Sequence, residues 1–200
     1  MTILAISTAS PALSLSLFDG EAVVAHDHRV IGRGHAEALM PAIAAMLAGR
    51  SSPAAVLVDV GPGSFTGIRI GIAAARALGL AWGVPVTGFC GAALVAARAF
   101  VERPGLPAVR VLMDGGRGQL LVSDWSADYG HGATRTLDPD AVAHDTAMAG
   151  AGAALLSGGA DIVHDGHPDA AFALALPARL RAGPPAAHYI RPHGAILPLG

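Results

Sequence analysis

The sequence predicts an α/β protein with a sizeable core, and three observations carry this prediction. An apolar run at 56–60, rich in valine, stops at Gly61-Pro62-Gly63 and is followed by a helical pattern. Near the N-terminus, Leu13, Leu15 and Leu17 alternate with serines, which is typical of a half-buried strand. The chain has 200 residues and is 52% hydrophobic, which is enough for one domain or two small lobes.

The first half of the chain predicts an antiparallel run of strands followed by alternating helices and strands. Asp19-Gly20 is a hairpin signal between the second and third strands. The expected order is strands at 2–6, 13–17 and 23–28, a helix at 35–48, a strand at 56–60, a helix at 66–81, a strand at 84–87 and a helix at 91–101. This order is typical of an actin-like, sugar-kinase-like ATPase lobe, and the pattern alone also allows other mixed α/β sheets.

A Pro/Gly cluster at 102–107 is the best candidate for a boundary between two lobes. We therefore expect an N-terminal lobe at 1–103 and a reduced C-terminal lobe at 104–200, which has few large side chains for its length. In the second lobe the sequence predicts strands at 109–113 and 119–125, a helix at 139–149, a small-residue strand and turn at 153–159, and a helix at 169–181.

Two helices of the first lobe carry more apolar surface than an ordinary amphipathic helix. The helix at 35–48 is apolar around most of its circumference, and such a helix needs cover on more than one side. In the helix at 66–81, Gly67 and Gly71 share a face that lets another backbone approach closely. The alternative is that both are ordinary core helices. We expect them to form a partner interface made of His35, Leu39, Met40, Ile43, Met46, Leu47, Ile68, Arg69, Ile72 and Arg76.

Composition excludes several classes of function. A formal net charge of −2 with 13 basic residues gives no basic stripe for a nucleic-acid backbone. Cys90 is the only cysteine, which rules out a disulfide or a thiolate cluster within the chain and suggests a buried apolar role. The uncharged stretch 77–97 is long enough to span a membrane, but its glycines and Pro85 favour helix end, strand and turn. The N-terminus has no positive n-region, so we expect a cytoplasmic protein.

The loop at 61–66 is a candidate anion-binding loop because it precedes a helix N-terminus. It is not a P-loop, since no Gly-Lys-Ser/Thr follows, and its glycines miss the dinucleotide-binding spacing by one residue. The histidines suggest two metal-ligand groups, His26 with His28 and His164 with His167, of which the second has more acidic neighbours. Both lack the metalloprotease spacing, no Gly-x-Ser-x-Gly elbow occurs, and we assign neither a metal site nor a catalytic residue.

Several motifs together resemble the bacterial TsaB (YeaZ) family. The most specific is GPGSFTGIRIG at 61–71, accompanied by HAEALMP at 35–41. Shorter similarities are ILAIST at 3–8, VPVTG at 84–88, LMDGGR at 112–117 and YIR at 189–191. The resemblance implies the actin-like (ASKHA, ribonuclease H-like) fold with two lobes. It also implies a non-catalytic subunit that binds TsaD, together with TsaE, for threonylcarbamoylation of adenosine 37 in tRNAs that read codons beginning with A.

The resemblance also implies partners and surfaces. TsaB-family proteins bind TsaD, or a second copy when TsaD is absent, through the helices that correspond to 35–48 and 66–81. We expect tRNA to be bound only through the complex and no contact with a membrane. No tightly bound cofactor is expected, and the interface of the complex is the place left open for ATP or ADP.

The chain departs from the family pattern at Ser7, where the family usually has Asp. A hydroxyl cannot replace the charge with which actin-like ATPases hold a metal, so the departure argues against independent hydrolysis. Asp59, at the end of a strand, could substitute, but an acid there is more often solvated or capping. The candidate nucleotide-proximal residues are Ser7, Thr8, Gly61, Gly63 and Ser64. The alternative functions are an ATP-dependent enzyme or glycoprotease-like peptidase, and a nucleotide-binding module without turnover.

Overall fold

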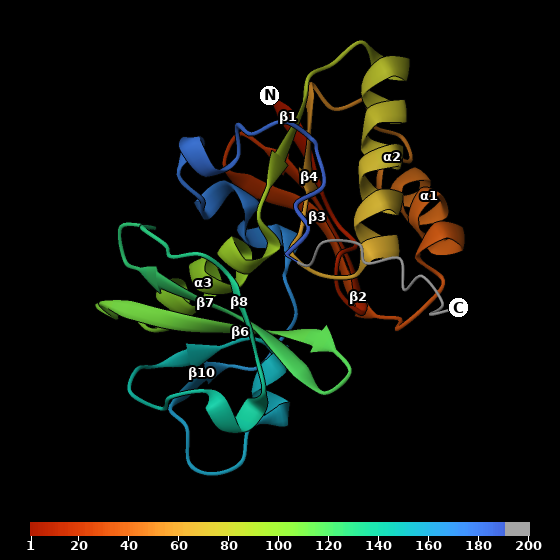
Figure 1. The fold of residues 1–200 in the computed structure, drawn as a ribbon. Coiled ribbons are helices and arrows are strands. Elements are labelled where there is room, and N and C mark those ends of the chain that lie inside the picture. The colour runs from red at the N-terminus through yellow and green to blue at the C-terminus, as the bar shows by residue number, and fades with distance from the viewer. Residues whose placement is uncertain (191–200) are drawn as a thin grey trace, which may run out of the picture.

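The computed structural model describes residues 1–190 and contains two five-stranded sheets (Figure 1). Residues of the expected first lobe form one sheet and residues of the expected second lobe form the other. The strands of the first sheet are β1 Thr2–Ser7, β2 Ala12–Asp19, β3 Ala22–Val30, β4 Ala55–Asp59 and β5 Val86–Phe89. The strands of the second sheet are β6 Ala108–Gly116, β7 Gln119–Ser126, β8 Arg135–Leu137, β9 Met148–Ala149 and β10 Ile162–His164.

The described chain has three α-helices, and they form layers with the sheets. The helices are α1 His35–Met46, α2 Phe65–Trp82 and α3 Gly91–Glu102. Helices α1 and α2 cover one face of the first sheet, whereas α3 lies between the two sheets (Figure 1). Buried side chains of α3 belong to one continuous core with side chains from both sheets. The layers are therefore α1 and α2, the first sheet, α3, and the second sheet.

The second sheet repeats the topology of the first. In the first sheet the order is β3-β2-β1-β4-β5, with antiparallel pairs among β1, β2 and β3 and parallel pairs joining β1, β4 and β5. The second sheet has the order β8-β7-β6-β9-β10, with the same sequence of antiparallel and parallel pairs. The mixed α/β architecture with two sheets confirms the predicted fold class.

The first lobe follows the predicted local patterns closely. β1 and β4 are central strands, and most of their side chains are buried, as their continuous apolar runs predict. Helix α2 begins at Ser64, whose side-chain oxygen accepts a hydrogen bond from the Gly67 N–H at 3.2 Å. It ends at Gly83, which has the left-handed conformation that commonly terminates helices.

The second lobe differs from the prediction in three segments. The helix predicted at 139–149 is a 3₁₀ turn at Pro139–Ala141 followed by β9, because pairing of β9 with β6 and β10 extends the backbone. The strand predicted at 153–159 is instead a 3₁₀ turn, Ala151–Leu155. The helix predicted at 169–181 is divided into two 3₁₀ turns, Ala170–Ala175 and Ala178–Leu180. Pro177 causes this break, since the residue before a proline avoids the helical region.

The apolar stripes of α1 and α2 face the first sheet and each other. Leu39, Ile43, Ile68 and Ile72 are almost completely buried in one cluster with side chains of β1 and β4. The prediction that these four side chains contact a partner is therefore wrong, because their own chain already encloses them. Apolar periodicity fits a core helix and an interface helix equally well, and here the core interpretation is correct.

None of the helices in the described part of the chain is long and apolar enough to cross a membrane. The uncharged stretch at 77–97 contains the end of α2, strand β5 and the start of α3, as the sequence predicted. Arg191, part of the C-terminal motif named above, lies outside the described residues.

We expect Ile43→Ala to lower the free energy of unfolding by about 2–5 kcal/mol, because it removes buried methyl groups from a packed core. Met40→Ala on the same helix is the matched control, since Met40 is 45% exposed, and its effect should stay within about 0.5 kcal/mol. Urea unfolding followed by tryptophan fluorescence measures both. Equal stability of the two variants would contradict the assignment of Ile43 to the core.

Candidate functional site

The glycines of the motif at 61–71 bring α2 into direct contact with the turn between β1 and β2. A Cβ atom on Gly63 would lie 2.1 Å from the Ala9 carbonyl oxygen, and one on Gly67 would lie 2.0 Å from the Thr8 carbonyl oxygen. Thr8 also donates a hydrogen bond from Oγ1 to the Gly67 carbonyl at 2.7 Å. The predicted close approach to Gly67 is therefore real, but the approaching backbone belongs to the same chain.

Asp59 is buried beneath this turn and is the centre of a polar junction. Its Oδ2 accepts a hydrogen bond from Ser7 Oγ at 2.7 Å, and its Oδ1 accepts one from the Gly61 N–H at 2.9 Å. The Gly91 N–H, at the start of α3, donates to the Gly61 carbonyl at 3.1 Å and also lies close enough to the Asp59 carboxylate to oppose the rise of its pKa. Asp59 therefore lies beside the N-terminus of α3, where a negative charge is favoured, and the alternative of a solvated residue is wrong, since it is 1% exposed.

Burial raises the pKa of Asp59 to about 6, although the hydrogen bonds from Ser7, Gly61 and Gly91 oppose the increase. Both carboxylate oxygens are already used by the chain itself, and Ser7 is neutral. The carboxyl ends of β1 and β4 thus present no free carboxylate with which to hold a metal ion beside a nucleotide. All five candidate nucleotide-proximal residues, Ser7, Thr8, Gly61, Gly63 and Ser64, have structural contacts, and two of them, Gly63 and Ser64, also line a cavity.

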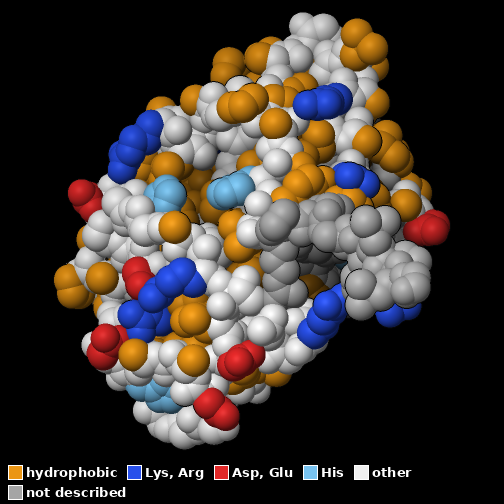
Figure 2. All heavy atoms as spheres, viewed as in Figure 1, with side chains coloured by type: hydrophobic (Ala, Val, Ile, Leu, Met, Phe, Trp, Pro, Cys, Tyr) orange, Lys and Arg blue, Asp and Glu red, His pale blue; other side chains and the backbone are white. Residues whose placement is uncertain are grey.

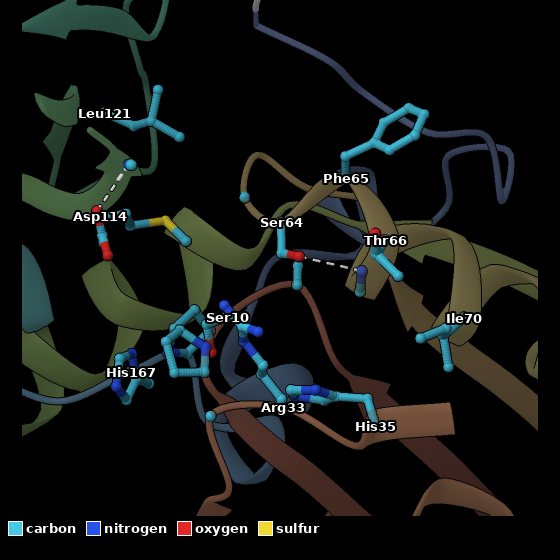
Figure 3. Close-up of a pocket in the computed structure, with 18 of the residues that line it drawn as sticks. Ser10, Arg33, His35, Ser64, Phe65, Thr66, Ile70, Asp114, Leu121 and His167 are labelled. Carbon is cyan, nitrogen blue, oxygen red and sulfur yellow. Dashed lines mark hydrogen bonds between the residues drawn. The ribbon is translucent and has the colours of Figure 1, made fainter. Parts of the chain in front are cut away.

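A cavity of about 800 Å³ opens between the two lobes. Figure 3 shows Ser64 and Thr66 at the start of α2 on one side and Asp114 and His167 on the other, with Arg33 below them. Burial lowers the pKa of His167, which favours the neutral imidazole. Among the described residues, no serine or threonine hydroxyl hydrogen-bonds to a histidine.

The exposed parts of α1 and α2 differ from the predicted interface. His35 is buried, and its Nε2 lies 3.3 Å from the Ala12 carbonyl oxygen. Met46 and Leu47 are only partly buried and pack at the edge of the core. The most exposed large apolar side chains on the two helices are Met40 and Leu80, and Leu80 is 87% exposed. Leu80 was not among the predicted residues, because its position on the exposed face depends on the packing of α2.

Arg69 and Arg76 are exposed on α2 as an interface would require, but the chain's own C-terminal segment contacts both. Arg69 stacks over the Phe65 ring at 3.5 Å from the ring centroid and donates from Nε to Tyr189 Oη at 3.0 Å. Arg76 donates from Nη2 to the Pro185 carbonyl at 2.8 Å. The part of α2 that is left for a partner therefore excludes the side chains that contact the C-terminal segment.

The structure changes which histidines form a cluster. His26 and His28 lie together with Asp169, so that one ligand atom from each is within 4.8 Å of the others. His164 and His167 do not form such a group in the described chain. Cys90 is partly buried beside the core, and burial raises its pKa to about 11, which suits a structural thiol.

The repeated sheet order and the cavity between two lobes define a protein of the actin-like, sugar-kinase-like fold. The family profile described as tRNA N6-adenosine threonylcarbamoyltransferase (TsaD) matches residues 28–163. The solved structure of YeaZ from Pseudomonas aeruginosa superposes with a TM-score of 0.74 at 27% identity, covering 88% of this chain and 89% of that one. The chain therefore belongs to the TsaD family, in the branch of the TsaB (YeaZ) proteins.

Curated relatives point to the same branch. The Escherichia coli protein TsaB, named for tRNA threonylcarbamoyladenosine biosynthesis, is 31% identical over 135 residues, which cover 64% of this chain and 56% of that protein. An uncharacterized protein of Mycobacterium tuberculosis is 43% identical over 95 residues, or 44% of this chain and 45% of its own length. The chain thus spans about half the length of the curated relatives it matches. A second solved structure, with a TM-score of 0.79, 26% identity and coverage of 95% of this chain and 99% of that one, is described as similar to peptidase YeaZ from P. aeruginosa.

We expect Asp59→Asn to change how stability depends on pH. The raised pKa means that the unfolded chain releases this proton at lower pH than the folded chain, so the contribution of Asp59 to stability falls between pH 4 and about pH 6. Relative to Asp59→Asn, the wild type should lose about 3 kcal/mol of unfolding free energy over this interval. Denaturant unfolding across the pH range measures the difference, with Asp140→Asn, a substitution of an exposed carboxylate, as the control. Parallel pH profiles of wild type and Asp59→Asn would contradict the burial of a titrating carboxyl.

We expect Gly63→Ala to destabilise the protein by more than about 2 kcal/mol, because the new methyl group would collide with the Ala9 carbonyl and the backbone φ of 153° disfavours alanine. Gly159→Ala is the control, since nothing lies within 4 Å of its Cβ position. Thermal and denaturant unfolding compare the two. A Gly63→Ala variant as stable as Gly159→Ala would mean that the loop does not require a glycine for packing.

Proposed function

We propose that this chain is a non-catalytic subunit that binds TsaD, together with TsaE, in the threonylcarbamoylation of adenosine 37 of tRNA. The Escherichia coli and Bacillus subtilis relatives named TsaB support the pathway. The non-catalytic role is supported mainly by the environment of Asp59. Among the described residues at the junction of β1 and β4, this is the carboxylate, and it is buried and accepts hydrogen bonds from Ser7 and Gly61. An ATPase of this fold needs an available acid at this place.

The proposed docking surface is the exposed face of α1 and α2. We define this helix face by its exposed side chains, which are mostly apolar or small: Met40, Pro41, Ala44, Ala45, Ala48, Ala73, Ala77 and Leu80. Small side chains allow a partner helix to approach closely, and a specific interface of about 800 Å² per partner needs about 20 residues, which two helices and their flanks supply. In the absence of TsaD, a second copy of this chain is the proposed occupant.

The surface charge supports the proposal that other subunits hold the tRNA. All 13 basic residues are arginines, and on the face shown in Figure 2 they are scattered among acidic side chains. Arg103 pairs with Asp161, and Arg110 pairs with Asp124 and Asp145. Paired and scattered arginines do not make the continuous positive surface that binds phosphate backbones.

The enzyme alternatives have less support. A peptidase of the serine type needs a hydroxyl paired with a base, and the described cavity residues contain no such pair. We propose that the chain binds no nucleotide tightly by itself. The proposed place for ATP or ADP is the interface with the partner. Purified chain with ATP and magnesium should show no turnover, and hydrolysis abolished by Asp59→Asn would instead favour the enzyme.

The docking surface can be tested with Met40→Glu combined with Leu80→Glu. Both side chains are exposed, so the variant should fold, but buried charges should weaken capture of TsaD at least tenfold. Binding to purified TsaD from the same organism is measured by interferometry, and self-association by light scattering. Val101→Glu, which replaces an exposed apolar side chain on α3, is the control and should bind like wild type. Unchanged binding of the double variant would place the interface elsewhere.

A further inference from the structure

Two histidines on an edge strand converge with an aspartate from the C-terminal half of the chain. His26 and His28 are two residues apart on β3, so both side chains lie on the same face of the first sheet. Their rings stack with a centroid distance of 6.1 Å. Asp169, which is 143 residues from His26 in sequence, caps the 3₁₀ turn Ala170–Ala175 beside this face.

The distances among the three side chains suit a metal site. His26 Nε2 lies 2.8 Å from Asp169 Oδ1, and His28 Nδ1 lies 3.9 Å from the same oxygen. All three ligand atoms lie within 4.8 Å of one another. Ligands bound tetrahedrally to zinc at about 2.0–2.1 Å are separated by roughly 3.3 Å. The cluster therefore needs only small side-chain movements to surround one ion.

Unsatisfied polar atoms at the cluster are a second and independent observation. His28 Nδ1 is buried and has no hydrogen-bond partner among the described residues, and the same is true of Ser16 Oγ. Ser16 is the cross-strand neighbour of His26, and Ser14 is the neighbour of His28, on the adjacent strand β2. Buried polar atoms without partners are uncommon, and a bound ion is one of the few explanations for them.

The surroundings of Asp169 already orient its carboxylate. Oδ1 accepts hydrogen bonds from the Ala171 N–H at 2.9 Å and from Ser14 Oγ at 3.3 Å. Ser14 Oγ in turn accepts a hydrogen bond from the Ala170 N–H at 2.9 Å. Partners of this kind fix the ligands of metal sites in place. No hydrogen bond from the described residues reaches Oδ2, which leaves that oxygen available for coordination.

We propose that His26, His28 and Asp169 bind a divalent transition-metal ion, with zinc as the best match. Two imidazoles and one carboxylate are ligands that zinc accepts, and three protein ligands leave a fourth position for water. The His26 side chain is 36% exposed, so an ion can enter from solvent. A bound ion would fasten the segment around Asp169 to the edge of the first sheet, which is distant from it in sequence. This proposal does not depend on the proposed function.

The competing explanation is a plain His26–Asp169 ion pair with His28 stacked beside it. That explanation accounts for the 2.8 Å contact but leaves His28 Nδ1 unpaired. It also predicts that Asp169→Asn has no effect on metal affinity, whereas a metal site predicts a large effect. The two explanations therefore differ in a measurable property.

The test is zinc binding by the whole chain after treatment with a chelator and removal of the chelator by dialysis. Competition with a chromogenic zinc indicator should give one equivalent bound by wild type, and His28→Ala and Asp169→Asn should each bind zinc at least about tenfold more weakly. Exposed His144→Ala, which removes a histidine outside the cluster, should match wild type. Zinc should also raise the melting temperature of wild type but not of the two site variants.

Circular dichroism without metal checks that each variant folds. Asp169→Asn keeps a capping side chain, and His26→Gln, on the exposed edge strand, replaces His28→Ala if that variant does not fold. Two outcomes would overturn the proposal. One is a wild type that binds zinc no better than a variant lacking both His26 and His28. The other is zinc affinity that survives unchanged in Asp169→Asn.

Discussion

The hydrogen-bonded carboxylate of Asp59 is the interaction on which the centre of the structure depends. It joins the end of β1 through Ser7 and the loop after β4 through Gly61, and the Gly61 carbonyl in turn accepts a hydrogen bond from the Gly91 N–H at the start of α3. These three segments come from distant parts of the chain and meet at a place closed to water. A buried acid with every oxygen satisfied positions backbone, and for that reason it is not available to hold a metal ion beside a phosphate.

The glycine-rich motif at 61–71 packs against the same junction. Gly63, Gly67 and Gly71 let α2 pack directly on the turn that contains Thr8 and Ala9. The glycines of a motif that looks like an anion-binding loop in the sequence thus have a packing role in the structure, and function has to be argued from the site rather than from the fold. The proposed docking surface is the outer side of the same helices, where Met40 and Leu80 are exposed.

The sequence predicted the first lobe well because its signals are local. The valine run of β4, the Ser64 cap and Gly83 mark their elements within a few residues. The helix predicted at 169–181 failed because Pro177 interrupts it, and the helix predicted at 139–149 failed because pairing of β9 extends the backbone. The apolar stripe with Leu39 and Ile43 was assigned to a partner, although the same periodicity describes a core. Asp169 could not be joined to His26 from sequence, because only folding brings them together.

The position of helix α3 between the two sheets restricts how the lobes can move relative to each other. The side chains from Ala92 to Ala97 are completely buried, and they belong to one apolar core with side chains of both sheets. Moving one lobe away from the other would expose these apolar side chains to water, at a free-energy cost that grows with the area exposed. The shared core therefore opposes a change in the distance between the two lobes. A ligand that enters the cavity between them must fit the width that the cavity already has.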